Sequence, residues 1–428
     1  MTDGPVYRDR DFHVFAAIRF IVTIAMQVQS VAIGWQVYAI THSTFALGMV
    51  GLCQFAPMFV LTLPAGDISD RFDQRKVLSA TQAMQSVCAG LFLVLVLFAP
   101  KIPWPYYAVL VLFGATRGFY GPASQSLLPF LVAPEKLPRA IALSSSVFTT
   151  ATIAGPALGG FLYWLGPMAT FSTSLTLMVA ASVLTASLGG RRRPPHVDTG
   201  ASRLERVREG IDFVRHRPVV LGAISLDLFA VLLGGATALL PAYARDILHV
   251  GPIGLGILRS GPAIGAALMA FSLARKPIQR QTGITMFAAV AVFGFATIVF
   301  GLSTMFGVSL LALAVLGASD MISVFVRSAL IQYATPDEMR GRVSAVSMLF
   351  IGASNELGEF ESGITADWFG TVASVVIGGI GTLVVVAAWM ALFPSLRNID
   401  RLADAARAPR LEPQPLLVKT AAGKEDTP

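Results

Sequence analysis

Twelve long apolar runs dominate this 428-residue sequence and restrict what it can fold into. Each run has about 20 or more mostly apolar residues, the length that an α-helix needs to cross the hydrocarbon core of a bilayer. The runs are 12–40, 45–69, 77–99, 104–130, 139–165, 167–190, 219–246, 252–274, 281–303, 306–333, 342–365 and 369–394. Turn or helix-breaking residues separate most of them. The sequence therefore predicts an all-α membrane protein with twelve transmembrane helices.

The scarcity of charge excludes several classes of protein. Only 13% of the residues are charged and 54% are apolar, whereas soluble proteins average about 25% charged residues. So little charge cannot cover a water-soluble globule of this length, which excludes a soluble enzyme, a disordered protein and a nucleic-acid binder. Cys53 and Cys88 lie in apolar runs, and no spacing of Cys or His suggests a disulfide framework or a metal site. We expect no cofactor and no enzymatic activity.

The distribution of Lys and Arg predicts the orientation. If the N-terminus is cytoplasmic, 26 of the 32 basic residues fall in cytoplasmic segments. Positive charge is enriched on the cytoplasmic side of membrane proteins. We therefore expect a multi-pass membrane protein with both termini in the cytoplasm, in contact with lipid headgroups.

A basic stretch divides the chain into two halves of six runs. The predicted segments are a cytoplasmic N-terminus 1–11, a first half 12–190, a linker 191–218, a second half 219–394 and a disordered tail 395–428. The segments 133–137 and 335–339 resemble each other and precede the fifth run of each half. Two related halves predict a pseudo-symmetric transporter with its substrate site at the interface of the repeats.

The linker has an amphipathic pattern. Leu204, Val207, Ile211 and Val214 recur at helical spacing among charged residues. This pattern predicts a short helix that lies on the cytoplasmic face of the membrane. An ordinary solvated linker is the alternative.

A few charged and polar residues lie inside the apolar runs. Such residues are costly in lipid, so they usually face a bundle interior, pair with one another or carry function. The residues of this kind that we select as candidates are Arg19, Gln27, Arg117, Asp227, Asp320, Arg327, Glu356 and Glu359. Glu356 and Glu359 are i,i+3 neighbours on one helix and cannot both be ionised easily in a low dielectric. We predict that these residues line a central cavity and couple to protons, with Glu359 as the first choice and Asp227 as the second.

An alternative explanation for the buried acids stays open. They can form structural ion pairs with Arg19, Arg117 or Arg327. Glu361 is the weakest candidate because it faces away from Glu356. Trp35 and Tyr38, near the outer end of the first run, are expected to be anchors at the membrane interface.

The loop after the second run carries a recognisable motif. Its residues Gly66, Asp70, Arg71, Arg75 and Lys76 resemble the signature loop of the major facilitator superfamily, although Asp73 stands where that family usually has Gly. The resemblance implies that Asp70 pairs with basic groups and a helix N-terminus of the other half, as a latch on the cytoplasmic side. A basic turn that only sets orientation is the alternative.

A second motif points to a branch of that superfamily. Gly155, Pro156, Gly159 and Gly160 resemble the antiporter motif of drug/proton exchangers, with Ala151 in place of the first Gly. Arg117 resembles an arginine that the family links to proton transfer. Residues 10–395 as a whole resemble a bacterial subgroup that contains enterobactin (siderophore) exporters and macrolide efflux pumps. This resemblance implies a location in the bacterial inner (plasma) membrane. Small-residue packing alone is the alternative for the glycine motif.

The residue patterns and the family resemblance together predict a secondary active exporter driven by proton antiport through alternating access. Its substrate would be a bulky amphipathic molecule, siderophore or drug-like. Its partners would be the small-molecule substrate, protons and membrane lipids, without nucleic acid, and we expect a monomer. A proton-coupled symporter that imports its substrate is the first alternative. A non-transporting receptor or scaffold is the second, but neither the linker nor the tail is large enough for a soluble module.

Overall fold

The structure is a computed structural model that describes residues 10–98, 102–188 and 203–407. These residues form α-helices and short 3-10 and π segments, and no β-strand occurs among them. The long helices of the first half are α1 (Arg10–Thr41), α2 (Thr44–Arg71), α3 (Gln74–Phe98), α4 (Trp104–Leu127), α5 (Leu137–Leu165) and α6 (Pro167–Ala186). Those of the second half are α8 (Pro218–Leu233), α10 (Gly251–Arg275), α11 (Thr282–Leu302), α12 (Phe306–Ala334), α13 (Asp337–Phe369) and α14 (Thr371–Leu392).

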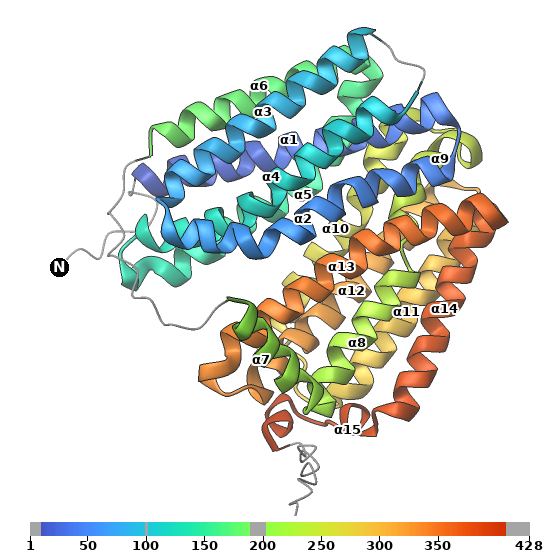
Figure 1. The fold of residues 1–428 in the computed structure, drawn as a ribbon. Helices are drawn as coiled ribbons and strands as arrows, with labels where there is room; N and C mark the ends of the chain where they lie inside the picture. The colour runs from blue at the N-terminus through green and yellow to red at the C-terminus, as the bar shows by residue number, and fades with distance from the viewer. Residues whose placement is uncertain (1–9, 99–101, 189–202, 408–428) are drawn as a thin grey trace, which may run out of the picture.

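The two halves form separate groups of helices that lie against each other (Figure 1). Each group has its own apolar core, around Phe15 and Leu78 in the first half and around Leu226 and Phe287 in the second. Within the described residues, ten helical segments are long and apolar enough to cross a membrane. The other two long helices, α4 and α13, have 24 and 33 residues and pack among them. The all-helical membrane fold is confirmed, and the count of twelve spans stays a prediction.

Corresponding turns show the relation between the halves. Gly166 joins α5 to α6 with φ 133°, and Gly370 joins α13 to α14 with φ 89°. Both turns need a backbone conformation that favours glycine. His42, which follows α1, and His249, which follows the seventh apolar run, also share a positive φ, of 49° and 52°. The pseudo-symmetry that the sequence predicts is therefore visible in the turn geometry.

The seventh apolar run, 219–246, is not one continuous helix. α8 ends at Leu233, and three short segments follow: a 3-10 turn η4 (Ala236–Leu239), α9 (Leu240–Ala242) and a π-helix η5 (Tyr243–Ile247). The break falls at Gly234 and Gly235, where a Cβ on Gly235 would lie 2.4 Å from the carbonyl oxygen of Gly358. The helix breaks here because the chain passes close to α13. The apolar pattern of the sequence did not predict this break.

The amphipathic linker helix is present, but its apolar face does not lie on the membrane. α7 (Arg203–Arg215) packs on α13 (Figure 1). Val214 is buried, and Val207 and Ile211 pack against the apolar core of the second half. Glu209 pairs with Arg342 at 2.6 Å. The predicted membrane-surface position is therefore wrong for the described residues of this face, because the apolar stripe covers protein. The side chain of Leu204 and residues 191–202 lie outside the described part.

The halves pack most closely at one end of the molecule. We call the end where α1 begins and where α7 and α15 (Pro394–Arg397) lie the terminal face. The end where α1 ends and α5 joins α6 is the distal face (Figure 1). At the distal face α5 packs closely on α10 and α2 on α13. A Cβ on Gly160 would lie 2.4 Å from the carbonyl oxygen of Pro252.

A second glycine contact closes the same end, and the other end is different. A Cβ on Gly363 of α13 would lie 2.6 Å from the Cα of Gly48 on α2. Toward the terminal face, residues 141–143 and 148–150 of α5 are exposed on successive sides of the helix. The interface is therefore tight at the distal face and loose at the terminal face.

Candidate functional site

A cavity of about 610 Å³ lies between the two halves. Helices α1, α2, α4 and α5 of the first half line it together with α10 and α13 of the second. Its polar lining includes Arg19, Gln27, Ser30, Gln54, Arg117, Arg259, Glu356 and Glu359, and its apolar lining includes Met26, Ile33, Met58, Phe113 and Phe148. Three arginines and two glutamates thus face one space that also offers apolar surface.

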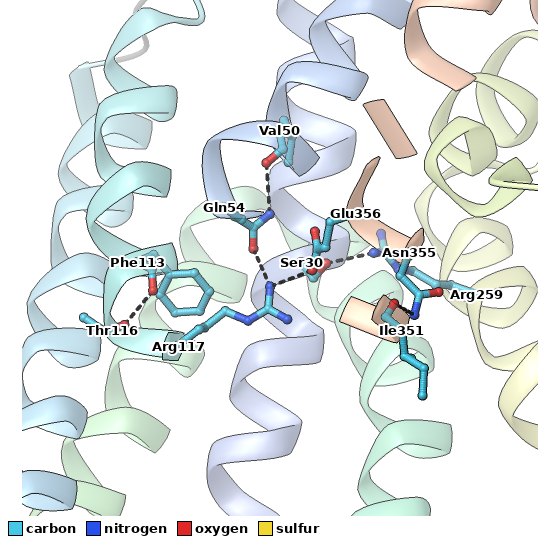
Figure 2. Close-up of polar contacts among 10 residues, drawn as sticks. All are labelled: Ser30, Val50, Gln54, Phe113, Thr116, Arg117, Arg259, Ile351, Asn355 and Glu356. Carbon is cyan, nitrogen blue, oxygen red and sulfur yellow. Dashed lines mark hydrogen bonds and ion pairs between the residues drawn. The ribbon is translucent and has the colours of Figure 1, made fainter. Parts of the chain in front are cut away.

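An ion pair crosses the cavity from one half to the other (Figure 2). The guanidinium of Arg117 on α4 lies 3.4 Å from Oε1 of Glu356 on α13. The same guanidinium donates to Oε1 of Gln54 at 3.2 Å, and the amide of Gln54 donates to the carbonyl oxygen of Val50 at 3.3 Å. The two charged side chains are 32% and 15% exposed. This contact is long and partly solvated, which suits a pair that breaks and re-forms.

A second arginine links the halves deeper in the structure. Arg259 of α10 donates to the hydroxyl of Ser30 on α1 at 2.9 Å (Figure 2). The sequence analysis did not include Arg259 among the candidate site residues. The available signal was its position inside the apolar run 252–274, where a lone arginine needs a polar partner. Ser30 and Gln54 were also missed, because uncharged polar residues are common in membrane helices.

Glu359 lies at the seam between α2 and α13. A Cβ on Gly51 would lie 3.0 Å from its Oε2 atom. Glu356 is one turn away on the same helix and also faces the cavity. By contrast, the amide of Asn355 donates to the carbonyl oxygen of Ile351 on its own helix at 2.9 Å. Glu359 therefore combines exposure to the cavity with a position where the halves meet.

Arg19 and Gln27 occupy the first-half wall of the cavity. Arg19 donates to the hydroxyl of Ser144 at 3.1 Å, and its guanidinium carbon lies 5.2 Å from the centre of the Phe148 ring. Gln27 donates to the carbonyl oxygen of Thr152 at 3.5 Å. Both residues thus attach α1 to α5 and still face the cavity.

The other predicted charges are elsewhere. Asp227 of α8 pairs with Arg327 of α12, and the two side chains are only 7% and 3% exposed. Asp320 lies near them beside a separate small cavity in the second half. None of these three residues lines the large cavity, so the prediction that all the buried charges share one central cavity is wrong. A linear sequence shows that a charge is buried but not which side of its helix faces the interface.

Tyr38 also departs from its predicted role. It is 5% exposed and donates to the carboxylate of Asp246 in η5, across the two halves. Trp35 packs against Tyr163, with ring centres 6.4 Å apart. Tyr38 is therefore not an anchor in the lipid interface, because the partner half covers it.

The two family motifs take different places. The antiporter-type residues Gly155, Pro156, Gly159 and Gly160 lie on α5, where they are buried against α1 and α10. The surroundings of Gly66 and the side chains of Asp70 and Arg71 lie outside the described part. Arg75 donates to the carbonyl oxygen of Leu188 at 3.3 Å, and Lys76 is exposed. In the described residues no group of three or more His, Cys, Asp or Glu residues is suited to hold a metal ion.

Comparison with known proteins gives consistent results. A family model described as "Transmembrane secretion effector" matches residues 5–424. The chain is 26% identical over 398 residues to Enterobactin exporter EntS of Citrobacter koseri and 25% identical to that of Escherichia coli. Each match covers 90% of this chain and 92% of the relative.

Solved transporters share the fold. A POT peptide transporter matches with a TM-score of 0.73 and 11% identity, over 91% of this chain and 95% of that one. A bacterial homologue of the human lysosomal transporter Spinster, inward-facing and occupied, matches with a TM-score of 0.70 and 16% identity, over 91% and 97% of the two chains. The family match over nearly the whole chain, the helical fold and the cavity between two halves agree. The chain is a multi-pass membrane transporter that belongs to the transmembrane secretion effector family of the major facilitator superfamily.

Proposed function

We propose that this transporter exports a small amphipathic molecule, siderophore or drug-like, by proton antiport through alternating access. The observation that carries the proposal is the cavity between the halves, in which Glu356 and Glu359 of one half face Arg117 of the other. The relatives named as enterobactin exporters favour export over import. The antiporter-type motif on α5 favours exchange with protons.

The size and lining of the cavity support a drug-sized substrate. A volume of about 610 Å³ falls within the range of roughly 300–1,000 Å³ that is typical of small-molecule sites. Phe113, Phe148 and Met58 supply apolar surface, while Arg19 and Gln27 supply hydrogen-bond donors. An amphipathic molecule matches both kinds of surface. We propose a siderophore of the enterobactin class as the first substrate to test.

The packing of the halves supports an inward-open form. Because the distal face is closed by Gly160 and Gly363, substrate would enter from the terminal face. We propose that the terminal face is cytoplasmic in the bacterial inner membrane, on the basis of the clustered Lys and Arg. Export would then require the glycine contacts at the distal face to separate as the two halves of a monomer rock. Asp70, Arg71, Arg75 and Lys76 of the signature loop stay a predicted latch on the opposite side.

Glu359 is our proposed proton carrier. Ionising two neighbouring carboxylates in a low dielectric costs free energy, because burial and the like charge both disfavour the charged form. A proton that enters from the distal side would relieve that repulsion where α2 meets α13. Proton binding would thus change the energy of the seam that opens and closes during transport. Asp227, Asp320 and Arg327 lie away from this seam, and we do not assign them to the transport cycle.

Transport in inverted vesicles tests the coupling. In such vesicles, uptake of enterobactin into the lumen reports export. Antiport predicts accumulation when the lumen is acidic and loss of accumulation when an ionophore removes the pH gradient. Equal accumulation of enterobactin with and without the pH gradient would rule out proton coupling. Accumulation that needs an alkaline lumen would indicate symport instead.

The substitution Glu359→Gln tests the proton carrier. We expect proton-driven uptake to fall at least tenfold while enterobactin binding to the purified protein is retained. Glu361→Gln is the matched control, because Glu361 is on the same helix but does not line the cavity. Unchanged pH-driven uptake in Glu359→Gln would refute the assignment.

A further inference from the structure

The second half contains a small, partly open pocket that is distinct from the transport cavity. Its volume is about 10 Å³, and its polar lining is Asp227 from α8 and Ser319, Asp320 and Ser323 from α12. Apolar residues of α8 and α11, including Val231 and Phe293, complete the wall. A cavity of about 10–15 Å³ is the smallest that holds one water-sized occupant. The space therefore fits a single small ion or molecule.

The oxygen atoms around this cavity have unused bonding capacity. Ser323 is 2% exposed, and its hydroxyl has no hydrogen-bond partner. The hydroxyl of Ser319 donates to the carbonyl oxygen of Val315 at 2.8 Å, which leaves its lone pairs free to accept or to ligate. Buried polar groups in folded proteins nearly always have a partner. The unpartnered hydroxyl of Ser323 therefore indicates a bound species that an oxygen atom can coordinate.

The charge around the cavity defines that occupant further. Arg327 pairs with Asp227, so the carboxylate of Asp227 is already balanced by one positive charge. No cation is paired with Asp320 among the residues that the structure describes. With both acids ionised, the three groups have a net charge of −1. A monovalent cation would neutralise this charge, whereas a divalent ion would leave an excess of positive charge in the interior of the second half.

We propose that this cavity binds one sodium ion, with oxygen ligands from Asp227, Ser319, Asp320 and Ser323. Carboxylate and hydroxyl oxygens suit hard cations, and the small volume favours Na⁺ over the larger K⁺. The site lies within one half and shares no residue with the cavity around Glu359. It therefore stands independently of the proposed proton antiport.

Sodium binding is measured on the purified full-length protein in detergent. Thermal unfolding is followed in NaCl, KCl and choline chloride at constant ionic strength, and ²²Na⁺ binding is counted directly. We expect a saturable rise of the melting temperature in Na⁺, little effect of K⁺ and one bound ion per chain. Equal melting temperatures in NaCl and choline chloride, without ²²Na⁺ binding, would overturn the proposal.

Four variants locate the ion. Asp320→Asn removes the unpaired charge, and we expect it to weaken Na⁺ binding at least tenfold. Ser323→Ala removes one neutral ligand, and we expect a loss of several-fold without loss of folding, since the hydroxyl has no partner in the protein. Ser309→Ala is the control on α12, because its buried hydroxyl already donates to Ser303 at 3.0 Å.

The last variant separates this proposal from the previous one. Glu359→Gln should leave Na⁺ binding unchanged, even though we expect it to stop proton-driven transport. A loss of Na⁺ binding in Glu359→Gln, or full Na⁺ binding in Asp320→Asn, would place the ion elsewhere and overturn the proposal. A response to pH that is the same in NaCl and choline chloride would show that Asp320 takes up a proton rather than sodium.

Discussion

The two ion pairs inside the molecule differ in ways that separate structure from mechanism. Asp227 and Arg327 lie within one half, are almost fully buried and join α8 to α12. Arg117 and Glu356 join different halves, are partly exposed and are separated by 3.4 Å. The first pair lies within one group of helices, which would move as a unit in the proposed alternating access. The second lies between the two groups, where they would separate.

Burial alone does not identify a moving part of this molecule. A fully buried pair cannot be broken cheaply, because each separated charge would remain in a low dielectric. A partly solvated pair can open at little cost, since water replaces the lost partner. A third pair, Arg280–Asp400 at the terminal face, is 74% and 41% exposed and completes the series. The three pairs predict effects that fall with exposure.

The largest effect is expected for Asp227→Ala. This change leaves Arg327 as an unpaired buried charge, which typically destabilises a fold by about 3–5 kcal/mol. We expect a marked fall of the melting temperature in detergent and poor yield of folded protein. The double variant Asp227→Leu with Arg327→Met removes both charges and should recover most of the stability. A loss below about 1 kcal/mol in the single variant would show that the pair is not structural.

An intermediate effect is expected for Glu356→Gln. Its pair with Arg117 is partly solvated, so the free energy of unfolding should change by only about 0–1 kcal/mol. The balance between conformations should shift, because a link between the halves is lost. In a background without Cys53 and Cys88, spin labels would be attached at Trp164→Cys and Met305→Cys, two exposed positions at the distal face. The distance between the two labels should then show a larger population of long values.

Glu361→Gln serves as the control for this experiment as well, since it lies on α13 outside the cavity. A melting temperature as low as that of Asp227→Ala would place the Arg117–Glu356 pair with the structural pairs. An unchanged distance distribution would show that the pair does not hold the halves together.

The smallest effect is expected for Asp400→Asn. The backbone N–H of Gln281 donates to the Asp400 carboxylate at 2.9 Å, and the Arg280 guanidinium adds a second bond. These contacts lower the pKa of Asp400 below its usual value. The carboxylate therefore stabilises the folded state above its unfolded pKa of about 3.9, and this contribution disappears as the pH falls through the lower, folded pKa. Melting temperatures of the two proteins should differ slightly at pH 7 and converge toward pH 3. An equal difference at both pH values would contradict the ionic origin of the effect.

Local sequence was a good guide to the helices and a poor guide to their neighbours. The apolar runs predicted the long helices, and Gly166-Pro167 marked the turn between α5 and α6. The break after Leu233 was missed because it follows from a close approach to Gly358 of α13, more than 100 residues away in the sequence. The apolar stripe of α7 was recognised, but lipid and protein core are equally apolar partners for such a stripe.

The candidate site was predicted in part for the same reason. Glu356, Glu359, Arg19, Gln27 and Arg117 do line the cavity, and each was noticed as a polar group in an apolar run. Arg259, Ser30 and Gln54 also line the cavity and were not predicted as site residues. Asp227 and Arg327 looked equivalent to the others in the sequence and proved to be partners in the interior of one half.

The sequence by itself determined that this chain crosses a membrane as a bundle of helices in two related halves. Hydrophobic length and charge scarcity are local properties that act through the solvent, so they can be read residue by residue. Only the tertiary structure decided which buried charges meet across the halves and which stay inside one of them. The partners of each buried charge depend on the rotation of each helix about its axis and on packing between glycines distant in the sequence. The pattern of polarity along the chain specifies neither.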